Sequence, residues 1–190
     1  MTEVFDVAIV GSGFAGSLTA LLLRALGRSV LLIERGSHPR FAIGESSSPL
    51  ANLLLESLCR RYGLDRIAPL AAWGTWGRAY PEIGCGLKRG FTFYGHAPGR
   101  PFAARADRAD QLLVAASPND EVADTHWYRA DFDQFLQREA QESGAEYTDH
   151  TTIESVSFGP GVAELETVRG GRRLVRRARL LVDASGPGGA

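Results

Sequence analysis

Three glycines near the N-terminus stand at the spacing of a loop that binds a dinucleotide. Gly11, Gly13 and Gly16 follow an apolar run at residues 4–10 and precede a helical pattern. In this context the first glycine permits a tight turn and the second lets backbone N–H groups approach a pyrophosphate. The third lets the helix pack closely on the strand, and the helix dipole favours the phosphate charge. The candidate phosphate-binding residues are Gly11, Gly13, Phe14, Ala15 and Gly16.

An acidic residue follows at the end of the next apolar run, residues 29–33. Glu34 is placed to accept hydrogen bonds from the hydroxyls of an adenosine ribose, and its charge would repel the 2′-phosphate of NADP. Arg35 beside it is a further candidate contact to the cofactor. Residues 4–34 therefore predict a strand–helix–strand unit that binds the ADP part of FAD or NAD. This unit alone does not distinguish the two cofactors. The alternative is the same tight turn without a ligand.

The elements that would position these residues are marked along the rest of the chain. Helices are expected at residues 18–26, 49–62 and 132–143. Ser48 and Pro49 suit the start of the second helix, and Asp131 with Gln134 has the capping-box pattern for the third. Strands are expected at 90–95, 111–115, 146–148, 153–158, 162–168 and 174–179, with a hairpin at 170–171 and a buried strand from 180 into a glycine loop at 186. The pattern predicts an α/β fold, in which a Rossmann-like unit with a parallel central sheet is joined to a β-meander with a hairpin.

Composition and charge exclude several classes of protein. The net charge of −1 gives no general attraction to nucleic acid or to an anionic membrane. We find no signal peptide and no apolar run near the ~20 residues of a membrane span. Cys59 and Cys85 have no metal-type spacing and fit a reducing cytoplasm, and Cys59 is expected in the core. The arginines within residues 172–179 indicate a solvated strand edge more than a binding patch.

Four segments, in this order, resemble the FAD-dependent monooxygenase superfamily, and most nearly its flavin-dependent (tryptophan-type) halogenase-like branch. They are Gly11–Gly16, Gly44–Pro49, Arg129–Asp133 and Leu181–Gly186. The resemblance covers essentially the whole chain but only the first third to half of a usual member, so it implies FAD as the cofactor and a fold incomplete relative to the family. It implies one N-terminal FAD-binding domain over 1–190, with an ADP-binding unit at 4–34, a flavin-proximal loop at 36–49, a partial substrate-side segment at 70–125 and a helix with a meander at 131–186.

The resemblance also implies roles for residues outside the glycine loop. Gly44, Glu45 and Ser46 resemble a loop that passes beside the flavin ring; the alternative is a polar loop that caps the next helix. Arg129 resembles an arginine that reaches the cofactor; the alternative is an Asp–Arg surface pair. The last segment resembles a strand-end motif that contacts the cofactor, through Asp183 and Gly186.

One departure bears on the source of electrons. Single-component aromatic hydroxylases of the superfamily carry an arginine after the strand-end motif that serves FAD and NADPH, whereas this chain has Pro187-Gly188-Gly189 after Gly186. This departure argues against direct use of NADPH. We expect a two-component arrangement, in which a separate flavin reductase delivers reduced flavin.

Lys88 is the only lysine among 21 lysine and arginine residues. It lies in a segment that resembles the strand on which halogenases carry a lysine that receives or orients hypohalous acid. A compact amine whose pKa falls on burial offers what a guanidinium does not. The alternative is one exposed lysine without a function.

Other side chains are weaker candidates. His96 and His126 titrate near neutral pH, but a lone histidine is more often a structural hydrogen-bonding residue. Aromatic residues could line a pocket for an aromatic substrate or could equally belong to the core. These aromatic residues are Trp73, Trp76, Phe91, Phe93 and Tyr94.

Three functions remain open. The first is a flavin-dependent halogenase or related monooxygenase that acts on a small aromatic substrate. The second is a flavoprotein monooxygenase that modifies a partner protein or peptide. The third is an FAD-binding module without activity of its own.

Overall fold

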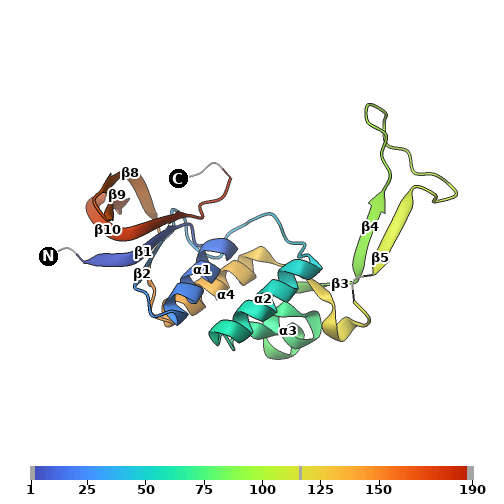
Figure 1. The fold of residues 1–190 in the computed structure, drawn as a ribbon, viewed down its shortest axis with the longest axis horizontal. Helices are drawn as coiled ribbons and strands as arrows, with labels where there is room; N and C mark the ends of the chain where they lie inside the picture. The colour runs from blue at the N-terminus through green and yellow to red at the C-terminus, as the bar shows by residue number, and fades with distance from the viewer. Residues whose placement is uncertain (1–2, 116, 188–190) are drawn as a thin grey trace.

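The apolar run at the N-terminus forms the strand β1 (Val4–Val10) inside a six-stranded sheet (Figure 1). The computed structural model describes residues 3–115 and 117–187. The sheet order is β7-β2-β1-β10-β9-β8. Three strands form the parallel part of the sheet with β1: β2 (Val30–Ile33) and β10 (Arg172–Asp183) pair with β1, and β7 (Glu146–Thr148) pairs with β2. The other two pairs are antiparallel, β10 with β9 (Val162–Arg169) and β9 with β8 (Thr151–Gly159). The sheet is therefore mixed, with the parallel centre and the antiparallel meander that the sequence predicts.

Helices stand on one face of this sheet and continue away from it (Figure 1). The helix α1 (Phe14–Ala25) contacts α4 (Arg129–Glu142), and the helix α2 (Pro49–Tyr62) lies beyond them next to the short helices η1 (Ala68–Ala71) and α3 (Trp73–Ala79). The α2 prediction is confirmed in detail. Ser48 Oγ accepts a hydrogen bond from Ala51 N at 3.1 Å, and Gly63 ends the helix in the left-handed conformation at φ +65°.

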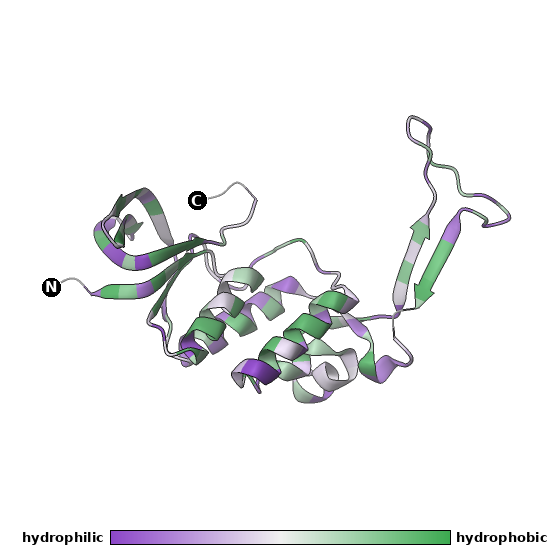
Figure 2. Cartoon of the chain, viewed as in Figure 1, coloured by the Kyte–Doolittle hydropathy of each residue, from purple (hydrophilic) through white to green (hydrophobic). Residues whose placement is uncertain are grey.

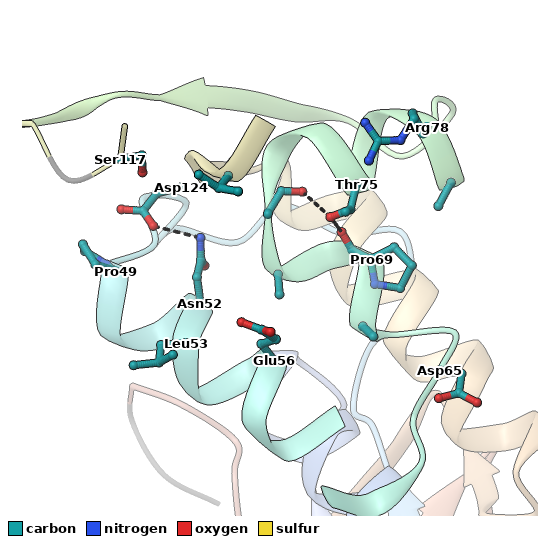
Figure 3. Close-up of a pocket in the computed structure, with 15 residues that line it drawn as sticks. Pro49, Asn52, Leu53, Glu56, Asp65, Pro69, Thr75, Arg78, Ser117 and Asp124 are labelled. Atoms are coloured by element: carbon teal, nitrogen blue, oxygen red, sulfur yellow. Dashed lines mark hydrogen bonds between the residues drawn. The ribbon is translucent and has the colours of Figure 1, made fainter. Parts of the chain in front are cut away.

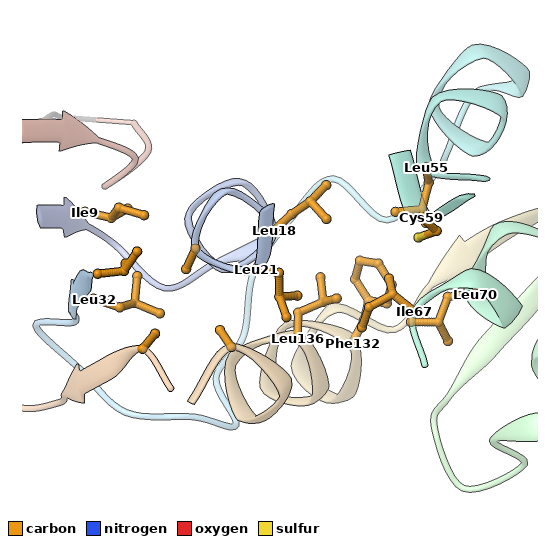
Figure 4. Close-up of a cluster of buried hydrophobic side chains, with 14 of the residues drawn as sticks. Ile9, Leu18, Leu21, Leu32, Leu55, Cys59, Ile67, Leu70, Phe132 and Leu136 are labelled. Carbon is orange, nitrogen blue, oxygen red and sulfur yellow. The ribbon is translucent and has the colours of Figure 1, made fainter. Parts of the chain in front are cut away.

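Buried apolar side chains form one continuous cluster from the sheet to α2 (Figure 4). Ile9 and Leu32 contribute from the strands, and Leu136 and Phe132 from α4. Cys59 of α2 is fully buried, as expected, and burial raises the pKa of its thiol to about 11. The glycine loop is thus held on a packed α/β core.

Phe132 is the aromatic centre of that core. Its side chain is fully buried, and its ring lies 4.7 Å from the Trp127 ring and 5.3 Å from the Trp76 ring, between centroids. We expect Phe132→Ala to lower the free energy of unfolding by about 3–5 kcal/mol, because it removes a large buried side chain and leaves a cavity. Chemical denaturation measures this. Phe158→Ala removes an exposed ring and should change stability by less than about 0.5 kcal/mol; equal losses in the two variants would contradict the packing.

Two small sheets extend the helical half. The strands β3 (Cys85–Lys88) and β6 (Asp124–Trp127) pair antiparallel, and the 3-10 helix η2 (Asp120–Val122) precedes β6. The strands β4 (Gly90–Tyr94) and β5 (Gln111–Ala115) form a separate hairpin that projects from the body (Figure 1). Apolar residues lie on both strands of this hairpin (Figure 2), and Phe93 and Leu113 are exposed.

Three sequence predictions were wrong at the level of elements. The helix α1 begins at Phe14, four residues before the predicted start. Asp131 does not cap α4; the helix begins at Arg129, and the Asp131 carboxylate instead accepts a hydrogen bond from Gly84 N at 3.1 Å. The predicted strands at 174–179 and from 180 are one strand, β10, because it pairs with β9 over its first part and with β1 over its last part. The last part of β10 was predicted to be buried, but Leu180 is 56% exposed.

The prediction of a solvated strand edge at the hairpin arginines is only partly right. Arg172 and Arg173 are exposed, but β10 lies between β9 and β1 in the sheet, and Arg176 and Arg177 are half-buried. Arg173 pairs with Glu154, Arg176 with Glu146 and Arg177 with Glu164. Glu164 lies on the adjacent strand β9, whereas Glu154 and Glu146 lie on the more distant strands β8 and β7. In the described ranges 3–115 and 117–187, no helix is long and apolar enough to cross a membrane.

Candidate functional site: a dinucleotide loop joined to a buried lysine

The glycine loop is closed so tightly that two of its positions exclude any side chain. Gly11 has φ +96°, and a Cβ atom there would lie 2.4 Å from Ala184 O. A Cβ atom on Gly16 would lie 1.8 Å from Gly11 O. Because all of these neighbours are backbone atoms, they have no rotamer with which to move aside. The turn between β1 and α1 therefore requires glycine at both places, as predicted.

Gly13 faces a different environment. The nearest atoms to a Cβ placed there are Arg40 Nη2 at 3.4 Å, Asp133 Oδ2 at 3.5 Å and Arg129 Nη2 at 3.8 Å. Gly13 is the N-cap of α1, and among the described residues no side chain caps this end of the helix. Uncapped N–H groups at a helix start, with guanidinium groups alongside, form a setting suited to an anion. Phe14 packs against Trp127, with 4.9 Å between ring centroids, and Ala15 is exposed.

Glu34 lies at the end of β2 beside the same loop, with its side chain largely buried. Its Oε2 accepts hydrogen bonds from Ser12 N and Ser12 Oγ at 3.0 Å each, and its Oε1 accepts one from Gly36 N at 2.9 Å. Burial alone would raise the pKa of Glu34, but these backbone N–H donors and the Arg40 guanidinium hold that pKa below its usual value. The carboxylate is therefore ionised and fixed in the loop.

A pocket of about 410 Å³ opens beside Glu34 and reaches the end of β10. It brings Gly11, Glu34 and Arg35 together, as the sequence predicts. It also adds residues of β8 that the sequence gave no reason to include. The lining residues are Val10, Gly11, Glu34, Arg35, Gly36, Arg40, Thr151, Thr152, Ile153, Ser185 and Pro187.

The lowered pKa of Glu34 predicts a pH dependence of stability. A carboxyl whose pKa is lower in the folded state than in the unfolded state stabilises the fold at neutral pH, and this contribution is lost as the pH falls through the folded-state pKa. We expect Glu34→Gln to lower the free energy of unfolding at pH 7, and the difference from wild type to shrink as the pH falls below the usual pKa of a glutamate and through the lower folded-state pKa. Denaturation curves at a series of pH values measure this; a difference that does not change with pH would contradict it.

The loop at Gly44–Ser48 is bound to β6 as an additional extended segment. Ser46 forms an antiparallel bridge with His126, Trp127 N donates to Glu45 O at 2.6 Å, and Ser47 N donates to Thr125 O at 3.2 Å. Gly44, Glu45 and Ser46 are exposed. Their backbone is thus fixed, while their other side faces outward.

Lys88, at the end of β3, lies directly against this loop and is only 4% exposed. Its Nζ donates to Ser46 Oγ at 2.7 Å and to Ser47 O, and lies 3.7 Å from the centre of the Phe91 ring. Burial lowers the pKa of the Lys88 ammonium, and the charge of Asp124 opposes this shift. The idea of an exposed lysine without contacts is wrong, because this amine is buried against the loop that resembles a flavin-proximal segment.

Arg129 joins the two parts of the site. Its Nε and Nη2 donate to the two carboxylate oxygens of Asp133 at 2.8 Å each, and its Nη1 donates to Ile43 O at 2.8 Å. Asp133 is fully buried, so the pair is a buried fork and not the surface pair considered above. Arg129 therefore fixes the start of the loop next to Gly13, and its contact with a cofactor stays a prediction.

Comparison with known proteins assigns the family. The family model described as FAD dependent oxidoreductase matches residues 6–190. This chain belongs to that family. It is 31% identical to monodechloroaminopyrrolnitrin halogenase PrnC of Pseudomonas fluorescens, over 96% of this chain and 31% of that protein. It is 28% identical to 1H-pyrrole-2-carbonyl-[peptidyl-carrier protein] brominase of Pseudoalteromonas luteoviolacea, over 96% of this chain and 37% of that protein.

A solved structure agrees with these matches. The halogenase PltM in complex with phloroglucinol and FAD aligns with a TM-score of 0.79 and 30% identity, over 97% of this chain and 35% of that one. The chain thus spans about a third of the length of these relatives. The resemblance to the halogenase-like branch of the FAD-dependent oxidoreductases, read from four segments, is confirmed.

The residues present fit the ADP part of the family cofactor. The space above Gly13 that a side chain would fill is flanked by the guanidinium groups of Arg40 and Arg129, which can donate to a pyrophosphate, and by the Asp133 carboxylate that pairs with Arg129. Glu34 stands at the ribose position of the dinucleotide-binding pattern, beside the 410 Å³ pocket. Arg40 Nε is buried and donates no hydrogen bond within the described chain.

The strand-end motif of this family member lies across from the glycine loop. Asp183 is opposite Val10 in the β10–β1 register, and its Oδ1 accepts hydrogen bonds from Ser185 N at 2.9 Å and Ser185 Oγ at 2.6 Å. Gly186 has φ +88°. The motif is therefore a tight turn directly beside Gly11, and its contact with the cofactor stays a prediction.

The aromatic candidates separate into different environments. Trp76 is core, fully buried with its Nε1 donating to Ile83 O at 2.9 Å. Phe91 lies under Lys88, whereas Phe93 and Tyr94 are exposed on the β4–β5 hairpin. His96 and His126 are exposed. Among the described residues, these aromatic side chains do not form a single pocket.

Sequence reasoning gave no role to several residues of the site, among them Ser12, His38 and Asp133. Ser12 holds Glu34, and His38 Nε2 lies 2.8 Å from Ser12 Oγ. Asp133 stands four residues after Arg129, the spacing of an ion pair on a helix, but the predicted helix began at residue 132 and left Arg129 outside it. The Ser12–His38 contact has no such local signal.

Proposed function

We propose that this protein is a flavin-dependent halogenase, or a closely related monooxygenase, that acts on an aromatic substrate with reduced FAD from a separate reductase. The observation that carries the proposal is the buried Lys88 amine bound to Ser46 and Ser47 of the loop assigned to the flavin. The 31% identity to PrnC and the 0.79 TM-score to PltM support the same class of reaction.

Each part of the site has a physical task in this proposal. The glycine loop and α1 bind the pyrophosphate, and Glu34 binds the adenosine ribose. Reduced FAD would supply the two electrons with which O₂ and halide give hypohalous acid and water. The Lys88 ammonium donates a hydrogen bond to the oxygen of the hypohalous acid and so orients the halogen toward the substrate. The ring carbon takes the halogen, the oxygen takes a proton from the Lys88 ammonium and leaves as water, and the ring proton passes to solvent, from which the Lys88 amine regains its proton.

Burial suits Lys88 to this task. A nearly dry amine makes stronger hydrogen bonds than one in water, and its neighbours Ser46 and Phe91 restrict its direction. Its lowered pKa makes proton donation easier near neutral pH. A guanidinium in this position would always carry a charge and would be too broad for the space that the Lys88 amine occupies.

The test is a product assay with the purified protein, dithionite-reduced FAD, oxygen, bromide or chloride and phloroglucinol. We expect mass spectrometry to find product that has gained halogen. Product that gains only oxygen would favour hydroxylation and overturn halogenation. Bound FAD with neither product would leave the FAD-binding module as the function of this chain.

A second candidate substrate is a group carried by a partner protein. The similarity to the brominase whose name includes a peptidyl-carrier protein favours it. The projecting β4–β5 hairpin, next to Lys88 in sequence and with exposed Phe93 and Leu113, offers a surface for such a partner. The same assay with a pyrrolyl-loaded carrier protein in place of phloroglucinol separates the two substrates.

A further inference from the structure

A histidine that the proposed function does not use stands behind the contact between Ser12 and Glu34. His38 Nε2 lies 2.8 Å from Ser12 Oγ and 3.0 Å from Ser12 O. Ser12 in turn directs both its backbone N–H and its hydroxyl to Glu34 Oε2. His38 follows Glu34 by four residues, so the loop that leaves β2 folds back onto the glycine loop and encloses the Glu34 carboxylate.

The contact with Ser12 O determines which ring nitrogen of His38 carries the hydrogen. A carbonyl oxygen only accepts hydrogen bonds, so Nε2 is the protonated nitrogen and donates to Ser12 O and Ser12 Oγ. The Ser12 hydroxyl then keeps its own hydrogen for Glu34 Oε2, at 3.0 Å. In the other tautomer, Nε2 and Ser12 O would be two acceptors facing each other, and the hydroxyl would turn from Glu34 to the ring.

The surroundings of His38 favour a neutral ring. Nδ1 is buried and has no hydrogen-bond partner among the described residues, so a second proton there would have no acceptor. Burial and the charge of Arg40 lower the pKa of His38, whereas the carboxylates of Glu34 and Asp133 oppose this shift without reversing it. Near neutral pH the ring is therefore an uncharged donor at Nε2.

His38 matters most for the Ser12 hydroxyl. Ser17 Oγ also donates to Ser12 O, at 2.8 Å, so the carbonyl would keep one donor if His38 were lost. The hydroxyl oxygen accepts from no described side chain other than His38. Without His38 the hydroxyl would be free to turn, and Glu34 Oε2 would lose one of the two donors that fix it.

We propose that His38 is a positioning residue of the cofactor site, which acts through Ser12 to hold the Glu34 carboxylate in the orientation that meets the adenosine ribose. The inference rests on the ribose role given to Glu34 in the proposed function, and it is independent of halogenation. It requires an uncharged donor at the place of Nε2. Glutamine supplies one from its side-chain amide, whereas phenylalanine keeps a ring without a donor.

The first measurement needs no ligand. His38→Phe should raise the pKa of the Glu34 carboxyl toward its usual value, because the Ser12 donors help to hold that pKa down. A ¹³C NMR titration of the carboxyl measures this. His38→Gln should restore the wild-type titration, and His96→Phe, at an exposed histidine, should not change it. In case His38→Phe fails to fold, ¹⁵N NMR of the wild-type ring tests the same contact and should show a hydrogen on Nε2 and none on Nδ1.

The second measurement uses ADP as the probe and calorimetry on the 190-residue chain. His38→Phe should weaken ADP binding about three- to tenfold, the effect of one hydrogen bond, and His38→Gln should bind within about twofold of wild type. Inorganic pyrophosphate lacks the ribose, so its affinity should not differ between these variants.

The larger pocket of the chain provides a further control. It has about 840 Å³ and lies between α2, η1 and α3, with Leu53 on one wall and Pro69 opposite (Figure 3). None of its lining residues lines the pocket beside Glu34. The one guanidinium among these lining residues, that of Arg78, is paired with Glu121 at 2.5 Å. Leu53→Trp, which fills this space from an exposed position, should therefore leave ADP binding unchanged.

The outcomes separate this inference from the proposed function. An unchanged Glu34 titration and ADP affinity in His38→Phe, or a wild-type ring with its hydrogen on Nδ1, would overturn the positioning role alone. An equal loss in His38→Phe and His38→Gln would also overturn it, because the donor would then not be what matters. No binding of ADP to the wild-type chain would overturn the cofactor site of the proposed function, and this inference with it.

Discussion

Replacing Gly16 by alanine should unfold or severely destabilise the protein, with a loss of about 4 kcal/mol or more in the free energy of unfolding. The added Cβ would lie 1.8 Å from Gly11 O and 3.4 Å from the side chain of Ala184. To remove the overlap, α1 must move away from β1, and the N–H groups at its start then lose their position over the loop. Any Gly16→Ala protein that folds should therefore bind FAD at least a hundredfold more weakly.

The matched control is the same substitution in another helix. Gly77 of α3 has space for a Cβ, with no described atom within 4 Å, and its backbone is not left-handed. Gly77→Ala should therefore stabilise the protein by about 0.5–1 kcal/mol, because alanine loses less conformational entropy in a helix. Thermal and chemical denaturation measure both variants. A Gly16→Ala protein of wild-type stability and FAD affinity would contradict the loop geometry.

Replacing Lys88 by methionine should abolish halogenation while FAD binding stays within about twofold of wild type. The thioether keeps the length of the side chain but loses the donor, so the oxidant is neither bound nor oriented. Because a placed proton donor contributes about 10²–10⁴ to a rate, product formation should fall at least a hundredfold. Arg89→Met is the control, since Arg89 is exposed and pairs with Asp120. Unchanged product yield in Lys88→Met would remove the role assigned to this residue.

The state of Lys88 can also be measured without turnover. Since Lys88 is the only lysine, protein labelled with ¹³C-lysine gives one side-chain Cε signal. Its pH titration should report a pKa below that of an ordinary lysine, because burial disfavours the ammonium form. A titration at the ordinary value would show that burial does not disfavour the ammonium form, and would contradict the buried site even if no activity is found.

The parts of the site that the sequence predicted are those defined by local chemistry. The turn at Gly11, the helix start at Ser48-Pro49 and the acid at Glu34 each follow from residues within a few positions of one another. The turn at Gly170-Gly171 is of the same kind. Steric limits on glycine and capping at helix ends act over short distances, so they are visible in the order of residues.

The parts that were missed depend on contacts between distant segments. The bond from Lys88 to Ser46 joins residues 42 positions apart, and the pairing of Ser46 with His126 adds the loop to β6. Asp131 had the local pattern of a helix cap, but its carboxylate is used by Gly84, 47 positions away. Tertiary contacts of this kind override local preference, and no periodic pattern in the sequence indicates them.

The central claim is that this chain holds the ADP end of FAD between Gly11 and Glu34. The most direct measurement is a competition titration, in which FAD bound to the purified chain is displaced by ADP or by FMN. The account predicts that ADP displaces FAD with an affinity close to that of FAD itself, and that FMN, which lacks the adenosine, does not. Displacement by FMN but not by ADP, or no binding of FAD at all, would contradict it.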